Sequence, residues 1–380
     1  MFKMKKVIAI MLALGLLGSL SACGKKEDVE KESETIKLGA VLPETGDVAV
    51  YGLAVKHGYE LAIKKYNDEG GVLGKQIELI AYDNKGDNSE TVNAYNKLVS
   101  SDKIDALLGA VISTNSLAIA PLAAKDGIPM LTPTSTAWDV TLAGENVFRS
   151  CYTDPFQGGT MARFASEDLK AKTAAVMYDT ANDYAVGLAE EFKKVFESNG
   201  GEIVNFEGFN AKDKDYKSVL TNIKGNSPEV LFIPDYYNTV ALVGKQAKEV
   251  GIEATLLGGD GWDGVLGVDK TAVEGGYFAN HFATDDEAEL IQNFVKSYKE
   301  AYDGEVPNAL AALGYDGAIT MIEAIKAAGS TDADKIVEAI NNTKLDLVCG
   351  YTEFDENRNP VKKVAIITIK DGEYKLHTKK

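Results

Sequence analysis

Two clusters of hydroxyl side chains in the first half of the chain could bind a small anion. Residues 113–116 (Ser-Thr-Asn-Ser) and the group Thr134, Ser135 and Thr136 each follow a short apolar run. Hydroxyl groups and the N–H groups at a helix N-terminus suit a carboxylate. Helix capping would explain either cluster alone, but two such clusters in one region favour a binding site.

Aromatic rings and one carboxylate occupy similar positions later in the chain. Tyr184, Tyr236 and Asp260 each come shortly after an apolar run, and Trp262 lies two residues beyond Asp260. A carboxylate beside aromatic rings suits an ammonium group, through a charge-assisted hydrogen bond and cation–π attraction. The alternatives are core packing for the rings and a turn for Asp260 in GGDGWD. An anion cradle and a cation partner together predict a zwitterion held between two parts of the chain.

The sequence contains no recognisable catalytic motif. It lacks GxSxG, HExxH, a Walker A motif and a GxGxxG that follows a strand. The three histidines, His57, His281 and His377, are far apart in sequence, and three cysteines are few for a zinc site or a disulfide scaffold. We therefore expect no catalytic residue, no metal and no cofactor.

The elements that must position these side chains alternate between strand and helix. Four apolar runs in a first block suit buried parallel strands: 36–42, 76–83, 104–111 and 128–133. Helices are expected between them over 51–70, 89–100 and 115–127, with Ser89 as the N-cap of the second and Gly127 ending the third.

A second block repeats the alternation. Its expected strands are 173–180, 201–209, 229–235 and 254–260, and its helices lie near 183–199, 214–224 and 237–250. Three further helices follow (287–302, 307–328 and 332–342), then strands within 348–377 joined by an Asp/Asn turn at 355–359. This pattern predicts an α/β protein with two doubly wound, Rossmann-like lobes joined by three crossover segments.

The first 23 residues are expected to direct export. Lys3, Lys5 and Lys6 precede an apolar run from Val7 to Leu20, which is too short for an ordinary transmembrane helix. Leu-Ser-Ala-Cys at 20–23 resembles a bacterial lipobox, with a plain secretory signal as the alternative. We expect a signal peptide over 1–22, lipidation of Cys23 and a flexible tether over 23–35.

Composition excludes several classes of function. The chain carries 57 acidic and 40 basic side chains, a net charge of −17, so it is not expected to bind nucleic acid or to dock electrostatically on an anionic membrane. A hydrophobic content of 45% is ordinary for a globular protein and argues against intrinsic disorder.

The chain resembles the branched-chain amino acid type of periplasmic binding protein, the solute receptor of an ABC importer. The resemblance covers nearly all of 36–380 and is carried by the stretches 38–62, 67–84, 104–121, 128–141, 147–158, 178–189 and 257–262. It implies the type I periplasmic binding protein fold, with a ligand cleft between the lobes. The lipobox suits a Gram-positive version tethered to the membrane.

The resemblance also implies roles for the candidate residues. Ser113 and Thr136 would hold the ligand carboxylate, and the backbone around Thr134 would accept a hydrogen bond from the ammonium group. Asp260 would neutralise that group, Tyr184 and Tyr236 would close over the ligand, and Tyr51 would cover its side chain. The full set of expected ligand-binding residues is Tyr51, Ser113, Thr134, Ser135, Thr136, Tyr184, Tyr236, Asp260 and Trp262.

Several positions depart from the leucine receptor of that family. That receptor has Glu where Asp260 stands and alanines near Thr134 and Ser135, and Trp138 and Trp262 also differ from its pattern. The departures leave open which amino acid binds. An acid at position 260 favours an amino acid over the amide and aromatic-acid ligands of other members.

The same resemblance implies a division of the chain. The first lobe would comprise 36–153 and 284–348, and the second 154–283 and 349–380. Crossover segments would fall near Cys151, Ala283 and Cys349, so Cys151 and Cys349 could form a disulfide or remain two small buried thiols.

These expectations describe a transport receptor that binds without reaction. It would capture an L-amino acid, most readily a branched-chain or aliphatic one, by hinge closure and deliver it to the permease subunits of an ABC importer. We expect a monomer on the outer face of the cell membrane, in contact with the membrane only through the lipid on Cys23. The alternatives are a sensing receptor domain of the same fold and a receptor for an amide or aromatic compound.

Overall fold

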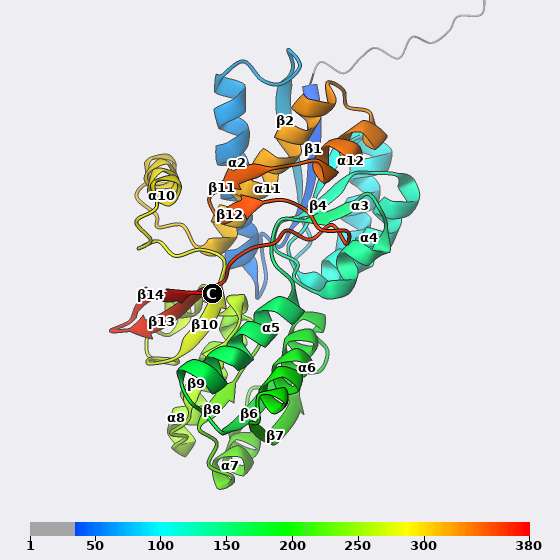
Figure 1. The fold of residues 1–380 in the computed structure, drawn as a ribbon. Coiled ribbons are helices and arrows are strands. Elements are labelled where there is room, and N and C mark those ends of the chain that lie inside the picture. Colours follow the sequence, from blue (N-terminus) through cyan, green and yellow to red (C-terminus); the bar gives the residue numbers. More distant parts are fainter. Residues whose placement is uncertain (1–34, 211) are drawn as a thin grey trace, which may run out of the picture. The chain divides into compact units, whose positions relative to one another are not determined.

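Two sheets organise the protein (Figure 1). The computed structural model describes residues 35–210 and 212–380, and Thr35–Lys380 form one compact unit. The expected signal peptide (1–22), Cys23 and the tether up to residue 34 lie outside the described residues. No helix in the described part of the chain is long and apolar enough to cross a membrane.

The first lobe is built on a five-stranded sheet with the order β2-β1-β3-β4-β5, in which every pair is parallel. Its strands are β1 (Thr35–Leu42), β2 (Gln76–Asp83), β3 (Ala106–Ala110), β4 (Met130–Thr132) and β5 (Val147–Arg149). The first four confirm the strands expected from the apolar runs. The three-residue strand β5 was not anticipated, because so short a run carries no periodicity.

The second lobe is built on a seven-stranded sheet with the order β14-β13-β10-β9-β8-β6-β7. Its strands are β6 (Thr173–Asp179), β7 (Glu202–Phe209), β8 (Val230–Phe232), β9 (Thr255–Gly258), β10 (Tyr277–Asn280), β13 (Ala365–Lys370) and β14 (Glu373–Lys379). Strands β6 to β10 are parallel, and the antiparallel strands β13 and β14 extend the sheet beyond β10. The parallel part repeats the order of the first sheet.

Helices connect the strands, and all but the segments 154–163 and 265–268, which were not anticipated, lie at or near the expected positions. In the two α/β blocks they are α2 (Ala49–Asp68), α3 (Asn88–Lys97), α4 (Ser113–Asp126), α5 (Asp154–Arg163), α6 (Asp183–Ser198), α7 (Lys217–Gly225), α8 (Tyr237–Val250) and the short α9 (Val265–Val268). Short helical turns are η1 (Leu98–Asp102), η2 (Trp138–Ala143), η3 (Phe164–Asp168) and η4 (Asp260–Trp262). Gly127 ends α4 with a φ of 70°, as expected.

The expected cap of α3 is wrong by two residues. Asp87, not Ser89, is the N-cap, because its carboxylate accepts a hydrogen bond from the Glu90 N–H. Asp and Ser are both good caps, and only the backbone path decides between them.

The last third of the chain crosses between the lobes. Helices α10 (Glu289–Ala301), α11 (Ala309–Ala328) and α12 (Ala333–Asn341) lead into the hairpin β11 (Leu345–Leu347) and β12 (Gly350–Thr352). Helix α11 packs closely on α2, where a side chain at Gly58 would lie 2.2 Å from the Ala311 carbonyl oxygen. The chain thus passes between the lobes after β5, after β10 and after β12.

The turn at 355–359 does not join the two long C-terminal strands. It is closed by the Asp355–Asn359 backbone hydrogen bond within the connection from β12 to β13. The turn between β13 and β14 is instead Asp371-Gly372, both with positive φ. Both segments have turn composition, and only strand pairing distinguishes them.

Cys151 and Cys349 are free, buried thiols in the structure. Burial raises the pKa of the Cys151 thiol to about 12, and it raises the pKa of the Cys349 thiol well above its ordinary value. Because the thiolate is the form that reacts, both thiols are poorly disposed to oxidation in this conformation.

Candidate functional site

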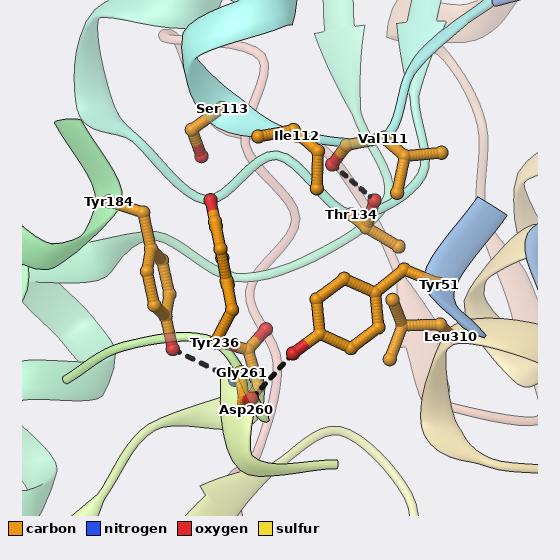
Figure 2. Close-up of a pocket in the computed structure, with 10 residues that line it drawn as sticks. All are labelled: Tyr51, Val111, Ile112, Ser113, Thr134, Tyr184, Tyr236, Asp260, Gly261 and Leu310. Carbon is orange, nitrogen blue, oxygen red and sulfur yellow. Dashed lines mark hydrogen bonds between the residues drawn. The ribbon is translucent and has the colours of Figure 1, made fainter. Parts of the chain in front are cut away.

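A cavity lies between the two lobes (Figure 2). Its walls come from the loops and helix starts that follow β1, β3 and β4 in the first lobe and β6, β8 and β9 in the second. These are the carboxyl ends of parallel strands, where ligands bind in open α/β sheets. The lining residues are Tyr51, Val111, Ile112, Ser113, Thr134, Tyr184, Tyr236, Asp260, Gly261 and Leu310.

The first-lobe wall presents two hydroxyl groups, and their existing hydrogen bonds determine whether each can donate to a ligand or accept from it. Ser113 is the first residue of α4, and its Oγ accepts a hydrogen bond from the Ala137 N–H at 3.3 Å, which leaves the hydroxyl hydrogen available to a ligand. Thr134 donates its hydroxyl hydrogen to the Val111 carbonyl oxygen at 2.7 Å, so its Oγ1 can only accept further bonds. The two hydroxyls therefore offer one donor and one acceptor.

Tyr51 crosses from the first lobe to the second. Its hydroxyl donates to the Gly261 carbonyl oxygen at 2.5 Å (Figure 2). The same hydroxyl accepts from the Tyr237 N–H at 3.2 Å. A second bond between the lobes runs from the Asn238 side chain to the Asp47 carbonyl oxygen. The lobes are thus held together at one side of the cavity.

Two tyrosines form the aromatic part of the second-lobe wall. Tyr184 and Tyr236 stack with ring centroids 5.2 Å apart, and the Tyr184 hydroxyl accepts the Gly261 N–H at 2.9 Å. Burial raises the pKa of both hydroxyls well above the ordinary value, so both stay protonated and neutral. A side chain at Gly261 would lie 2.7 Å from the Asp235 carbonyl oxygen and 3.0 Å from the Tyr184 hydroxyl, which explains a glycine there.

Asp260 supplies the carboxylate of the cavity and is held at two points. Its N–H donates to Gln157 Oε1 at 2.7 Å, and its Oδ2 lies 3.0 Å from His281 Nε2. Its Oδ1 is buried and has no hydrogen-bond partner among residues 35–210 and 212–380. A buried carboxylate oxygen without a partner is costly unless a ligand supplies a donor.

Three of the expected site residues do not line the cavity. Ser135 directs its hydroxyl to Ser116 Oγ at 2.6 Å, within a buried network behind the wall. Thr136 is buried, and its carbonyl oxygen accepts the Asp154 N–H at 2.9 Å. Trp262 donates its indole N–H to the Ile233 carbonyl oxygen at 2.8 Å and packs in the core.

Sequence reasoning missed the apolar side of the cavity. Val111, Ile112 and Leu310 line it beside Tyr51. Val111 and Ile112 directly follow β3, so their position after a strand was a usable signal. Leu310 lies in the second position of α11, whose approach to the cavity depends on its packing against α2.

Further acidic groups lie buried behind the second-lobe wall. Burial raises the pKa of Asp235 to about 8, although the hydrogen bond that its carboxylate accepts from the Tyr236 N–H acts to lower the pKa. Burial also raises the pKa of Asp154 well above its ordinary value, opposed by Thr136 and Arg149. Within the described chain, no group of three or more His, Cys, Asp or Glu side chains is placed to hold a metal ion.

The arrangement can therefore bind a small molecule with one anionic, one cationic and one apolar part. Ser113, at the N-terminus of the fourteen-residue helix α4, faces the anionic part. Asp260 and the Thr134 oxygen can accept from a cationic part, and the apolar residues surround the remainder.

Comparisons with known proteins show that the chain is similar to binding proteins for small molecules. Residues 35–373 match the model of a family described as periplasmic binding protein. The chain is 31% identical to the leucine-, isoleucine-, valine-, threonine- and alanine-binding protein of Pseudomonas aeruginosa over 85% of this chain and 87% of that protein.

Solved structures agree in fold over almost the whole chain. The leucine binding protein LivK of Thermotoga maritima is 35% identical, with a TM-score of 0.86 over 91% of this chain and 98% of that one. The branched-chain amino acid transporter substrate binding protein LivJ of Streptococcus pneumoniae, solved with isoleucine, is 32% identical, with a TM-score of 0.85 over 91% of this chain and 99% of that one.

Proposed function

The chain belongs to the branched-chain amino acid type of the periplasmic binding protein family, and from this we propose what it binds. Members of this family are substrate-binding proteins of transporters and not enzymes. It captures a branched-chain or other aliphatic L-amino acid between its lobes and delivers it to the permease of an ABC importer. It does so as a monomer outside the cell membrane, anchored by lipid on Cys23.

The division of the cavity into three chemical parts carries this proposal. Asp260 Oδ1 is buried without a partner in the described chain, and it lies across the cavity from the hydroxyl of Ser113. An α-amino acid places its ammonium group and its carboxylate on the same carbon, so it can satisfy both walls at once. A carboxylate without an ammonium group would leave Asp260 facing a like charge.

Each polar residue then takes one role. Ser113 and the first turn of α4 bind the ligand carboxylate, Asp260 and Thr134 accept from the ammonium group, and Tyr184 and Tyr236 cover it. Ser135, Thr136 and Trp262 support these residues from behind, through the buried bonds described above.

The apolar residues favour an aliphatic side chain. Val111, Ile112 and Leu310 together with the Tyr51 ring surround the part of the cavity away from the charged groups. A side chain of leucine or isoleucine size buried there gains about 1.5–3 kcal/mol.

Closure of the lobes completes the site. The Tyr51–Gly261 and Asn238–Asp47 bonds join opposite lobes, so they form only when the lobes approach. The ligand binds one lobe first, and closure brings the other wall onto it. The closed and open forms present different surfaces to the permease.

Isothermal titration calorimetry with a ligand panel tests the proposal. The panel contains L-leucine, L-isoleucine, L-valine, L-threonine, L-phenylalanine, D-leucine, isobutyramide and benzoate. We expect the branched-chain L-amino acids to bind most tightly, and D-leucine and isobutyramide to bind at least about a hundredfold more weakly. Tight binding of benzoate without binding of any α-amino acid would contradict the proposal.

Membrane anchoring is tested separately in cells. Metabolic labelling with a fatty acid should mark the wild-type protein and leave the Cys23→Ala variant unmarked. Equal labelling of the two proteins would refute lipidation at Cys23 without bearing on the ligand.

A further inference from the structure

His281 contacts the cavity carboxylate from behind. It directly follows β10, while Asp260 follows β9, and the two strands are parallel neighbours. Their carboxyl ends therefore lie side by side, and His281 Nε2 comes within 3.0 Å of Asp260 Oδ2. The imidazole is almost completely buried and is not among the residues that line the cavity.

A connected set of stacking and hydrogen-bond contacts holds the imidazole against Asp260. The His281 ring stacks on Tyr152 with centroids 3.5 Å apart and planes 19° apart. The Tyr152 hydroxyl donates to Gln157 Oε1 at 3.4 Å, and the same oxygen accepts the Asp260 N–H. The backbone and the carboxylate of Asp260 are thus held through one connected group of side chains.

The protonation of the imidazole follows from its surroundings. Its Nδ1 is buried with no hydrogen-bond partner within the described residues, whereas Nε2 faces a carboxylate oxygen that can only accept. A neutral ring with its hydrogen on Nε2 satisfies this geometry. Burial lowers the pKa of His281 against the opposing effect of Asp260, so the neutral form prevails at pH 7.

Other charged groups face this pair from several elements. Lys362, in the connection from β12 to β13, also acts to lower the pKa of His281. Asp154 of α5 lies near Asp260, and Arg149 of β5 opposes the charge of Asp154. The Asp286–Lys379 ion pair lines a neighbouring cavity that His281 also lines. None of these groups comes between His281 Nε2 and Asp260 Oδ2.

The geometry points to His281 as a positioning residue that donates its Nε2 hydrogen to Asp260 and so directs the charged carboxylate into the cavity. When His281 gains a second proton in acid, the binding of the ligand ammonium group becomes weaker. This inference rests on the proposed function. A neutral imidazole leaves the pair with a net charge of −1, which attracts the ligand ammonium group. An imidazolium makes the pair neutral overall and removes that attraction.

Nuclear magnetic resonance of the ligand-free protein tests the protonation directly. Long-range ¹H–¹⁵N spectra distinguish imidazole tautomers, and the spectrum of the His281→Gln variant assigns the signal among the three histidines. We expect the neutral tautomer with hydrogen on Nε2 at pH 7. An Nδ1–H tautomer or an imidazolium at that pH would overturn the inference.

Calorimetry as a function of pH tests the consequence. Wild-type affinity for L-leucine should fall on acidification from pH 7.5 to 5, by up to tenfold for each unit below the pKa of His281. His281→Gln keeps a donor near the Nε2 position but does not titrate, so most of the affinity at pH 7 should remain and the pH dependence should disappear. His281→Leu should weaken binding at least about tenfold at pH 7, because Asp260 Oδ2 loses its donor.

Two controls separate this effect from a general one. His57→Gln, on α2 against Tyr302, should reproduce the wild-type profile. 4-Methylpentanoate, which lacks the ammonium group, should show no loss of affinity on acidification. A wild-type profile in His281→Gln would overturn the inference. Failure of every α-amino acid to bind would overturn the proposed function, and the tautomer measurement would still test the His281–Asp260 contact.

Discussion

The two walls of the cavity occupy equivalent places in two sheets of the same strand order, yet they carry opposite chemistry. In the first lobe, the ends of β3 and β4 lead to Ser113 and Thr134, which are neutral hydroxyls already engaged by backbone groups. In the second lobe, the end of β9 leads to Asp260, a carboxylate with one unpartnered oxygen. Strand order decides where a site lies, and the residues after the strands decide what it binds.

The walls also differ in how they are supported. The first-lobe hydroxyls are held by hydrogen bonds to backbone groups of their own lobe, so that wall does not depend on these contacts from the other lobe. The second-lobe wall depends on side chains from three separate segments, represented by Gln157, Tyr184 and His281. Substitutions in the second lobe should therefore have larger and more varied effects.

The largest effect is expected from removing the charge of the second-lobe wall. Asp260→Asn should weaken L-leucine binding by at least about 2 kcal/mol in calorimetry, because the buried ammonium group loses its charged partner. Binding of 4-methylpentanoate should be unchanged or improved. Equal losses for both ligands would mean that Asp260 supports the fold and does not meet the ammonium group.

A smaller loss is expected from the first-lobe wall. Ser113→Ala removes one hydroxyl donor to the ligand carboxylate and should cost about 1.5 kcal/mol of L-leucine affinity. L-Leucinamide, which lacks the carboxylate, should bind the variant and the wild type equally. A loss of the same size for the amide would assign Ser113 to structure alone.

The hydrogen bonds that the Tyr51 hydroxyl makes between the two walls are expected to have a smaller effect on lobe closure. Tyr51→Phe deletes the hydroxyl that joins Gly261 and Tyr237 while it keeps the ring, so closure should lose about 1 kcal/mol. Small-angle X-ray scattering at subsaturating ligand should report a larger radius of gyration for the variant. Tyr59→Phe is the matched control, since its hydroxyl bonds Leu108 within the first lobe. Identical scattering of Tyr51→Phe and wild type would contradict a role in closure.

The last prediction concerns stability and a buried carboxylate of the second lobe. Burial raises the pKa of Asp235 to about 8, above that of an unfolded carboxyl group, so the folded protein holds an extra proton between about pH 4 and pH 8. Asp235 therefore lowers the free energy of unfolding increasingly as the pH rises through that range.

Asp235→Asn should remove this cost. Chemical denaturation should show the variant at least about 1 kcal/mol more stable than wild type at pH 9, with the advantage shrinking at pH 4.5. A stability difference that does not change with pH would show that Asp235 does not titrate with a raised pKa.

Much of the architecture could be predicted from the sequence because it depends on local periodicity. The run 76–83 centres on the apolar residues Leu79, Ile80 and Ala81, and β2 spans the same eight residues. Short strands such as β5 and β10 escaped prediction because three or four residues carry too little pattern. The cap of α3 was misplaced, and the turn between β13 and β14 was not anticipated, because several nearby residues have suitable chemistry.

The residues of the site likewise fall into those that the sequence could predict and those that it could not. Ser113, Thr134 and Asp260 were predictable, since residues that immediately follow strands of a parallel sheet meet at one edge. Leu310 and His281 were not, because the first reaches the cavity through the packing of α11 on α2, and the second acts through Asp260. Nothing in their local sequence marks either residue.

The sequence by itself determined the alternation of strands and helices, the strand ends that carry polar groups, and the absence of catalytic motifs. Only the tertiary structure decided which of those groups face a shared cavity, which hydroxyl can donate and which can only accept, and that a histidine supports the carboxylate. The physical reason is that hydrophobic periodicity is a local property of the chain, whereas hydrogen-bond roles, burial and the pKa shifts they produce depend on residues brought together from distant segments.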